Sequence, residues 1–396
     1  MVSTPVYLDN HATTPVDPRV LEAMLPFFRE AFGNAGSVSH GFGRAAAEAV
    51  EVARTQVAEA VGAGPREIIF TSGATESCNL ALRGLAERPR RKGNHIVSLA
   101  TEHKAVLDHL ARLARRGCEV TLLPVAPWDS PEAGRIDLDQ LRDSLREDTL
   151  LVSVMLANNE IGVIQPLAEI VKLCREREIP VHCDATQAVG KLPHTFAALG
   201  FDLASFSAHK IYGPKGIGAL YLRRGSRLRL EPQIDGGGQE QGLRSGTLNV
   251  PGIVGFGAAA ALCAAELSEE MERERALRDR LWQGLSENLS GVLLNGPRLE
   301  APDLRLANNL NCTFEYVDGE ALMMAMGDLA VSSGSACTSA NPEPSHVLRA
   351  LGRNEDHARG SLRFGLGRFT TAEVIEFAIH RVCEAVARLR KLSSMA

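Results

Sequence analysis

Short runs rich in β-branched and other apolar residues alternate with helical patterns between residues 65 and 225. The predicted strands are REIIFTSG (66–73), NHIVSLAT (94–101), CEVTLLPV (118–125), TLLVSVML (149–156), IPVHCDAT (179–186), LASFSAHK (203–210) and GIGALYL (216–222). Between most of them, apolar residues recur at helical spacing, as in KAVLDHLARLARRG and LAEIVKLCREREI. This alternation predicts an α/β fold with a mostly parallel central sheet. Ligands of such sheets bind at the carboxyl ends of the strands, so polar residues that follow strands are candidates for a site.

The pattern changes after residue 250. The segment PGIVGFGAAAALCAAELSEEMERERALRDRLWQGLSENL predicts one long helix or two, and it becomes heavily charged near Glu266. Weaker strands (NNLNCTF, LRFGLG) and helices (HVLRALG, TAEVIEFAIHRVCEAVARLRKL) follow, which is typical of an α+β domain. A chain of 396 residues usually forms more than one domain. We therefore predict a large domain over residues 16–262 and a smaller domain formed by residues 1–15 and 263–396.

The composition is that of an ordinary soluble protein, with 45% hydrophobic residues, 23% charged residues and a net charge of −5. No long basic run is present, so a role in binding nucleic acid or a membrane surface has no support. The N-terminal segment lacks the basic region and apolar stretch of a signal peptide. The apolar run from Ile253 to Ala265 is too short to cross a bilayer. We expect a cytoplasmic protein.

Seven of the eight cysteines lie in ordinary surroundings, several of them in apolar runs such as VHCD and ALCAA, where buried, unreactive thiols are expected. No CxxC pair is present, so we expect no metal site. Cys337 differs because it lies in the small, polar segment DLAVSSGSACTSANPEPSH. Such a composition suits an exposed, mobile loop that carries a nucleophilic thiol. An unreactive surface cysteine is the alternative.

Two polar residues follow neighbouring predicted strands. Lys210 ends a strand in SFSAHKIYGPKG and could form a Schiff base with a carbonyl cofactor; a solvated loop lysine is the alternative, and Lys215 is a local rival. Asp184 follows the apolar strand in HCDATQAVGK, so its carboxylate needs a cationic partner. A protonated pyridine nitrogen would serve, although a structural ion pair or a helix N-cap would place an aspartate here too.

Two glycine-containing segments are candidate phosphate-binding sites. In IIFTSGATESCNLALRGLA a strand runs through a short turn into a helix, so free N–H groups and the Thr75 hydroxyl could bind phosphate. An ordinary helix N-cap is the alternative, and the ending of a P-loop is absent. GFGRAAAEAV (41–50) matches a dinucleotide-binding motif, but it follows a loop rather than a strand. A nicotinamide-dependent oxidoreductase is therefore disfavoured.

The motifs together resemble those of a known family. They are YLDNHATTPVDP, FTSGATES, TEHKAV, NNEIGV, HCDATQAVGK, SFSAHKIYGPKG, RSGTLN, AVSSGSACTS and SLRFGLGRFT. In combination they resemble the cysteine desulfurases of the IscS/NifS type, which are fold-type I pyridoxal 5′-phosphate (PLP) enzymes of aminotransferase class V. The resemblance extends from Tyr7 to about Leu392. One departure is Gln239, where the family often has histidine in GGGHE.

The resemblance implies a role for each matching residue. Lys210 would bind PLP covalently and move the substrate Cα proton, and His103 would stack on the ring and act as acid or base. Asp184 would pair with the pyridine nitrogen, and Gln187 would bind the ring hydroxyl. The remaining PLP and substrate contacts would come from Ala74, Thr75, Ser207 and His209 (phosphate), Thr247 (phosphate of the partner subunit), Asn159 (ring and substrate), and Arg363 and Asn34 (substrate).

The implied reaction removes sulfur from L-cysteine, leaves L-alanine and places a persulfide on Cys337, for iron–sulfur cluster or other thio-cofactor synthesis. The resemblance also implies a homodimer and a sulfur-acceptor protein, such as an iron–sulfur scaffold. The alternatives are another PLP enzyme of this fold, such as an aminotransferase or selenocysteine lyase, and a catalytically silent PLP-binding scaffold. An aminotransferase would not need Cys337, and a silent scaffold would have lost Lys210 or Cys337; both residues are present.

Overall fold

The central element of the fold is a seven-stranded sheet. The computed structural model describes residues 3–88, 93–193, 195–333 and 344–393. The strands of this sheet are β2 (Ile68–Thr71), β3 (His95–Leu99), β4 (Glu119–Leu123), β5 (Thr149–Ser153), β6 (Val181–Asp184), β7 (Leu203–Ser207) and β8 (Gly218–Leu222). Their order is β2-β8-β7-β6-β5-β3-β4, and only β8 runs antiparallel to its neighbours. The predicted α/β fold with a mostly parallel sheet is confirmed.

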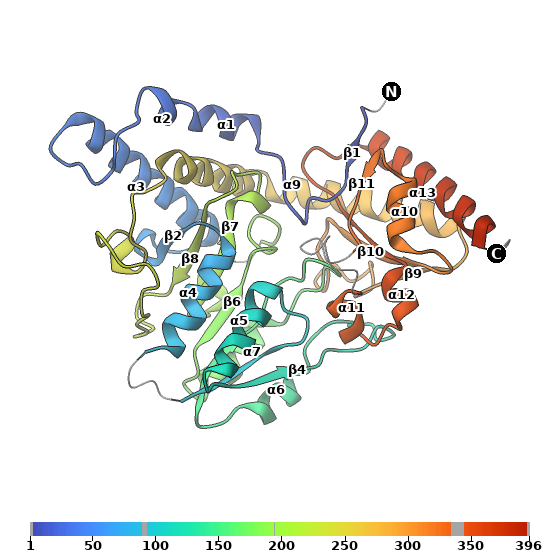
Figure 1. The fold of residues 1–396 in the computed structure, drawn as a ribbon, viewed down its shortest axis with the longest axis horizontal. Helices are drawn as coiled ribbons and strands as arrows, with labels where there is room; N and C mark the ends of the chain where they lie inside the picture. The colour runs from blue at the N-terminus through green and yellow to red at the C-terminus, as the bar shows by residue number, and fades with distance from the viewer. Residues whose placement is uncertain (1–2, 89–92, 194, 334–343, 394–396) are drawn as a thin grey trace.

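Helices cover both faces of this sheet (Figure 1). They are α3 (Gly41–Val61), α4 (Ala74–Ala86), α5 (Lys104–Arg115), α6 (Leu138–Ser144), α7 (Leu167–Arg175) and α8 (Phe196–Leu199), whereas α1 (Pro18–Met24) and α2 (Pro26–Arg29) pack against the long helix α9 (Val250–Asn288). The inner strands are buried along their whole length, because both of their faces are covered. The edge strand β4 is largely exposed. This explains why the inner strands read as continuous apolar runs in the sequence.

One helix, α9 (Val250–Asn288), runs from the large body of the molecule to the smaller one (Figure 1). It is one continuous helix, whereas the sequence predicted either one long helix or two. Ile253 and Phe256 pack in the core of the large sheet, whereas Leu281 and Leu285 pack in a second core. By length and composition α9 could also span a membrane, but half of its most apolar window is buried within the protein. Its apolar character is therefore that of a core helix.

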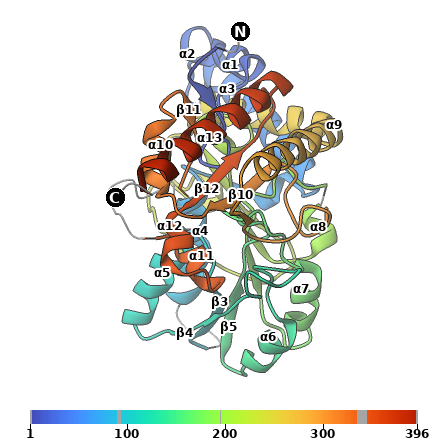
Figure 2. The same ribbon diagram turned by 90° about the vertical axis from the view of Figure 1, so that its right-hand side faces the viewer.

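The second core lies around a three-stranded antiparallel sheet of order β12-β10-β9. Its elements, with the short β1–β11 pair, are β1 (Val6–Tyr7), β9 (Val292–Leu294), β10 (Asn309–Phe314), α10 (Gly319–Ala325), β11 (Leu329–Ala330), α11 (His346–Ala350), α12 (Glu355–Arg359), β12 (Ser361–Gly365) and α13 (Ala372–Ser393). Figure 2 shows α13 and the end of α9 beside this sheet. Leu8 packs in this core, whereas Val20 packs in the first. The proposed division at residues 15/16 and 262/263 stays a prediction.

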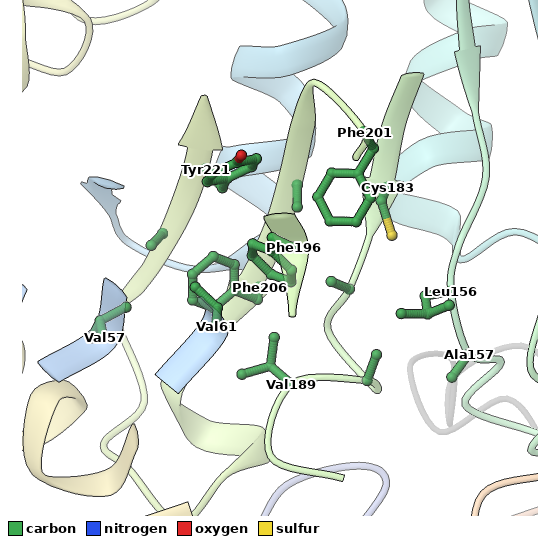
Figure 3. Packing of buried hydrophobic residues seen from close by; sticks show 14 of the residues in the cluster. Val57, Val61, Leu156, Ala157, Cys183, Val189, Phe196, Phe201, Phe206 and Tyr221 are labelled. Carbon is green, nitrogen blue, oxygen red and sulfur yellow. The ribbon is translucent and has the colours of Figure 1, made fainter. Parts of the chain in front are cut away.

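A cluster of aromatic rings packs along β7 and β8 (Figure 3). The Phe196 ring lies 5.0 Å from the Phe201 ring, 5.6 Å from the Phe206 ring and 5.2 Å from the Tyr221 ring, measured between centroids. Edge-to-face contacts of this kind stabilise a core beyond the area they bury. Because Phe206 is the penultimate residue of β7, this packing fixes the strand end from which Lys210 follows.

Candidate active site

A cavity of about 460 Å³ opens at the carboxyl ends of β5, β6 and β7. This is the edge of a parallel sheet where ligands bind. The starts of α4 and α5 face the same space. The predicted site residues that line it are Ala74, Thr75, His103, Asn159, Asp184, Gln187, Ser207, His209, Lys210 and Arg363. Segments far apart in the chain thus meet at one cavity. The motifs alone did not determine that they would meet.

Lys210 ends a short 3-10 turn, Ala208–Lys210, that directly follows β7. Its Nζ donates to the carbonyl oxygens of His11 and Ala12, each at 2.6 Å. These contacts hold the amine against the N-terminal segment, at the wall of the cavity. Its rival, Lys215, also lines the cavity but is exposed.

Asp184 is the last residue of β6 and is buried. One carboxylate oxygen, Oδ1, accepts from the Thr186 amide at 3.0 Å. Beneath it lies Glu102, whose carboxyl pKa is raised far above its usual range by burial. A buried carboxylate that faces a cavity needs a cation, and a ligand in this cavity could supply it.

The start of α4 lies at one end of the cavity and has the features of a helix start that can bind an anion. Gly73 precedes the helix with a φ of 154°, a conformation that favours glycine. Ser77 donates the first helical bond, to the Gly73 carbonyl, so the amides before it have no partner within the helix. The acidic residue of this first turn, Glu76, pairs with Arg244 at 2.9 Å. Partial positive charge from the helix therefore remains available to an anion.

Two histidines at the cavity have defined hydrogen bonds. The Nδ1 atom of His103, at the N-cap of α5, accepts from the Ala105 amide at 3.1 Å, so a neutral ring carries its proton on Nε2. His209 Nδ1 lies 3.1 Å from the Thr13 hydroxyl. Burial, and then the neighbouring Lys210, lower the pKa of His209 to about 4. His209 is therefore an uncharged hydrogen-bonding group at neutral pH.

Arg363 lies on β12 and is fully buried. Its Nη2 donates to Asp9 Oδ1 at 2.6 Å, and its Nη1 donates to the Asn159 carbonyl at 3.1 Å. Its Nε has no hydrogen-bond partner among the described residues. A buried donor without a partner is rare in proteins.

Three predicted residues are not brought to this cavity by the structure. Asn34 lies on the surface between α2 and α3, where its side chain accepts from the Gly36 amide at 2.8 Å and closes a turn. Thr247 is also exposed and does not line the cavity of its own chain. Cys337 lies outside the described residues. The roles assigned to Asn34, Thr247 and Cys337 stay predictions.

The structure adds residues that the motifs contained but that were given no role. His11 and His346 line the cavity. Glu160 is buried at the cavity wall, where its side chain accepts from the Ser345 hydroxyl, and burial raises its carboxyl pKa. His346 Nε2 donates to the Glu102 carbonyl at 2.9 Å. The signal that could have identified Glu160 is a charged residue placed directly before the apolar Ile161 in NNEIGV.

The cysteines that the structure describes are mostly buried. Six are buried and Cys383 is partly buried. Burial raises the pKa of Cys174 and Cys312 to about 12. The prediction of buried thiols is confirmed for the six buried positions. Within the same described ranges, no group of three or more His, Cys, Asp or Glu residues is arranged to hold a metal ion.

Comparison with known proteins agrees with the geometry. The family model "Aminotransferase class-V" matches residues 6–377. The chain is 57% identical over 391 residues to the cysteine desulfurase IscS of Anaeromyxobacter sp. (strain Fw109-5), covering 99% of this chain and 95% of the relative. A solved NifS-like protein superimposes with a TM-score of 0.88 at 39% identity, over 97% of this chain and 99% of that one. A second solved structure, SspA in complex with cysteine, superimposes with a TM-score of 0.79 at 35% identity. The match covers 92% of this chain and 100% of that one. The chain therefore belongs to the aminotransferase class-V family and, within it, to the cysteine desulfurases.

Proposed function

We propose that this chain binds PLP in the cavity around Lys210 and uses it to transfer sulfur from L-cysteine to Cys337, releasing L-alanine. The observation that carries the proposal is the convergence of an amine, a buried carboxylate and a helix start on one cavity, supplied by Lys210, Asp184 and α4.

The residues present fit PLP group by group. The buried Asp184 carboxylate suits a protonated ring nitrogen. The amides at the start of α4, with Thr75, Ser207 and the uncharged His209, suit the phosphate. Gln187 suits the ring hydroxyl. Bound PLP supplies an electron sink for the carbanion formed at the substrate Cα.

The chain's own residues would do the remaining work. Lys210 would take the Cα proton, and His103 would donate or accept protons at its Nε2. Arg363 would bind the substrate carboxylate, using the Nε that has no partner among the described residues. The C–S bond of cysteine breaks, the sulfur joins Cys337 Sγ, and the alanine methyl group gains a proton. Cysteine and thiol become alanine and persulfide, so this transfer needs no external oxidant.

We also propose that the protein is a cytoplasmic homodimer that passes its sulfur to an acceptor protein, such as an iron–sulfur scaffold. Large apolar side chains at the turn between α2 and α3, among them Phe28, Phe32 and Phe42, are more than half exposed. Contiguous exposed apolar surface is typical of protein–protein contacts. A partner chain there would also give exposed Asn34 a neighbour. Light scattering tests the dimer, because a monomer at micromolar concentration would contradict it.

The test of the cofactor site is to add PLP to the apoprotein, reduce with borohydride and identify the labelled lysine by peptide mass spectrometry. The cavity is lined by Lys104, Lys210 and Lys215, so the experiment separates neighbouring amines. Labelling at Lys210 and loss of the visible absorbance band in Lys210→Ala are expected. Labelling at Lys215, or a protein that stays colourless with PLP, would contradict the proposal.

A further inference from the structure

Lys191 is a buried amine to which neither the motifs nor the proposed reaction gives a role. Its side chain donates from Nζ to Gln187 Oε1 at 2.5 Å. The two residues lie four positions apart in the helical turns that follow β6, a spacing that places them on the same side. Lysine is rarely buried in proteins unless it is paired, so the position of Lys191 calls for an explanation.

The Gln187 carboxamide is held at both ends. Its oxygen faces His11 Nδ1 at 3.1 Å as well as the lysine amine, and its Nε2 donates to the His11 carbonyl at 3.0 Å. The same carbonyl accepts from Lys210 Nζ at 2.6 Å. Gln187 also lines the cavity. Lys191, Gln187, His11 and Lys210 therefore form one connected set of hydrogen bonds at the cavity wall.

Lys191 and the His11 carbonyl are the two members of this set that select which way the amide points, because the ammonium can only donate and the carbonyl can only accept. Burial lowers the pKa of His11 far below its ordinary value, so the neutral ring holds one proton, which Nε2 can donate to the Asn308 carbonyl at 3.3 Å or Nδ1 to the Gln187 oxygen at 3.1 Å. His11 can therefore face either the oxygen or the nitrogen of the amide. An ammonium group can only donate. A reversed amide would place its N–H groups against those of Lys191, and a buried donor without an acceptor is costly.

We propose that Lys191 is a positioning residue, which holds the oxygen of Gln187 away from the ligand and presents its free N–H to the ring oxygen of PLP. The inference rests on the proposed function, because PLP is the ligand that carries this oxygen. Lys191 does not line the cavity itself and acts through Gln187.

The test measures binding by the apoprotein of pyridoxine 5′-phosphate, which has no aldehyde and cannot bond to Lys210, and of its analogue without the ring 3-hydroxyl. Wild type, Lys191→Met, Gln187→Ala and the double variant are compared at about pH 6, because burial and then Lys210 lower the pKa of Lys191 to about 7. Lys191→Met should weaken pyridoxine 5′-phosphate binding roughly tenfold, the value of one hydrogen bond. Binding of the analogue should change by less than about twofold.

The double variant separates positioning from a general effect of charge or packing. If Lys191 acts through Gln187, Lys191→Met causes no further loss in the Gln187→Ala background. Lys172→Met, on the exposed face of α7, is the matched control and should bind as wild type does. Lys191→Gln, which can both donate and accept, should give a smaller loss and replaces the methionine variant if that variant does not fold.

Three results would overturn this inference and leave the proposed function intact. They are an equal loss of affinity for both ligands, a loss that is fully retained in the Gln187→Ala background, and unchanged binding by Lys191→Met when the wild type binds. A wild-type protein that binds neither PLP nor pyridoxine 5′-phosphate would instead overturn the proposed function and this inference together.

Discussion

Arg363 donates to Asp9 across 354 positions of the chain, and the two atoms lie 2.6 Å apart. This ion pair joins β12 to the N-terminal segment at the edge of the cavity. It fixes the plane of a guanidinium that would otherwise be a buried charge held only by the Asn159 carbonyl. The direction in which Arg363 presents its remaining N–H donors is thus set by Asp9.

Asp9→Asn should therefore raise the KM for L-cysteine about tenfold and change kcat less, because the guanidinium keeps its charge but loses its strongest bond. Steady-state kinetics with saturating PLP provide the measurement. Asp143→Asn, at an exposed position of α6, is the control. An unchanged KM would show that Asp9 does not position Arg363 for the substrate.

The turn before α4 depends on the glycine opposite it. A Cβ on Gly218 would lie 2.6 Å from Gly73 Cα and 2.6 Å from the Phe206 carbonyl oxygen, both of them backbone atoms. Gly218→Ala should displace this turn and weaken PLP binding by about tenfold or more, because the amides at the helix start lose their alignment. Gly41→Ala, where a Cβ meets nothing within 4 Å, is the control. Titration of the apoproteins with PLP measures the difference.

A buried bidentate ion pair stabilises the large domain. Arg54 donates to both carboxylate oxygens of Glu240, at 2.7 and 2.9 Å, and Glu240 also accepts from the Phe70 amide at 2.7 Å. Arg54→Met leaves this carboxylate buried without its cation, which should lower the free energy of unfolding by about 3–5 kcal/mol. Urea denaturation measures the change. Arg142→Met removes an exposed pair with Asp139 and should cost less than about 1 kcal/mol.

His182 predicts a pH dependence of stability. It is fully buried between the Ser153 and Ser205 hydroxyls, and burial lowers its pKa to about 4. The unfolded imidazole binds its proton near pH 6.5, so between about pH 6.5 and 4 the unfolded state holds more protons. Stability should therefore fall as the pH is lowered through this window. In His182→Asn the fall should be smaller, whereas exposed His380→Asn should follow wild type. Parallel curves for His182→Asn and wild type would contradict this assignment.

Local patterns predicted much of the site, because Asp184 ends β6, Lys210 lies three residues after β7, and the start of α4 follows β2. Contacts between distant segments could not be predicted in the same way. The bond between His11 and Gln187 spans 176 positions, and no local spacing encodes it. The single helix α9 was ambiguous for a related reason: its glycines weaken helix propensity, and packing in two separate cores stabilises it.

The central claim is that the Lys210 cavity moves sulfur from L-cysteine to Cys337. The most direct measurement is to supply PLP and L-cysteine without a reductant, quantify alanine and identify persulfide by peptide mass spectrometry in wild type, Cys337→Ser and Cys383→Ser. In the first turnover, wild type and Cys383→Ser should each form one alanine for every persulfide at Cys337. Cys337→Ser should bind PLP but form neither alanine nor persulfide. Alanine production by Cys337→Ser at the wild-type rate would contradict the account.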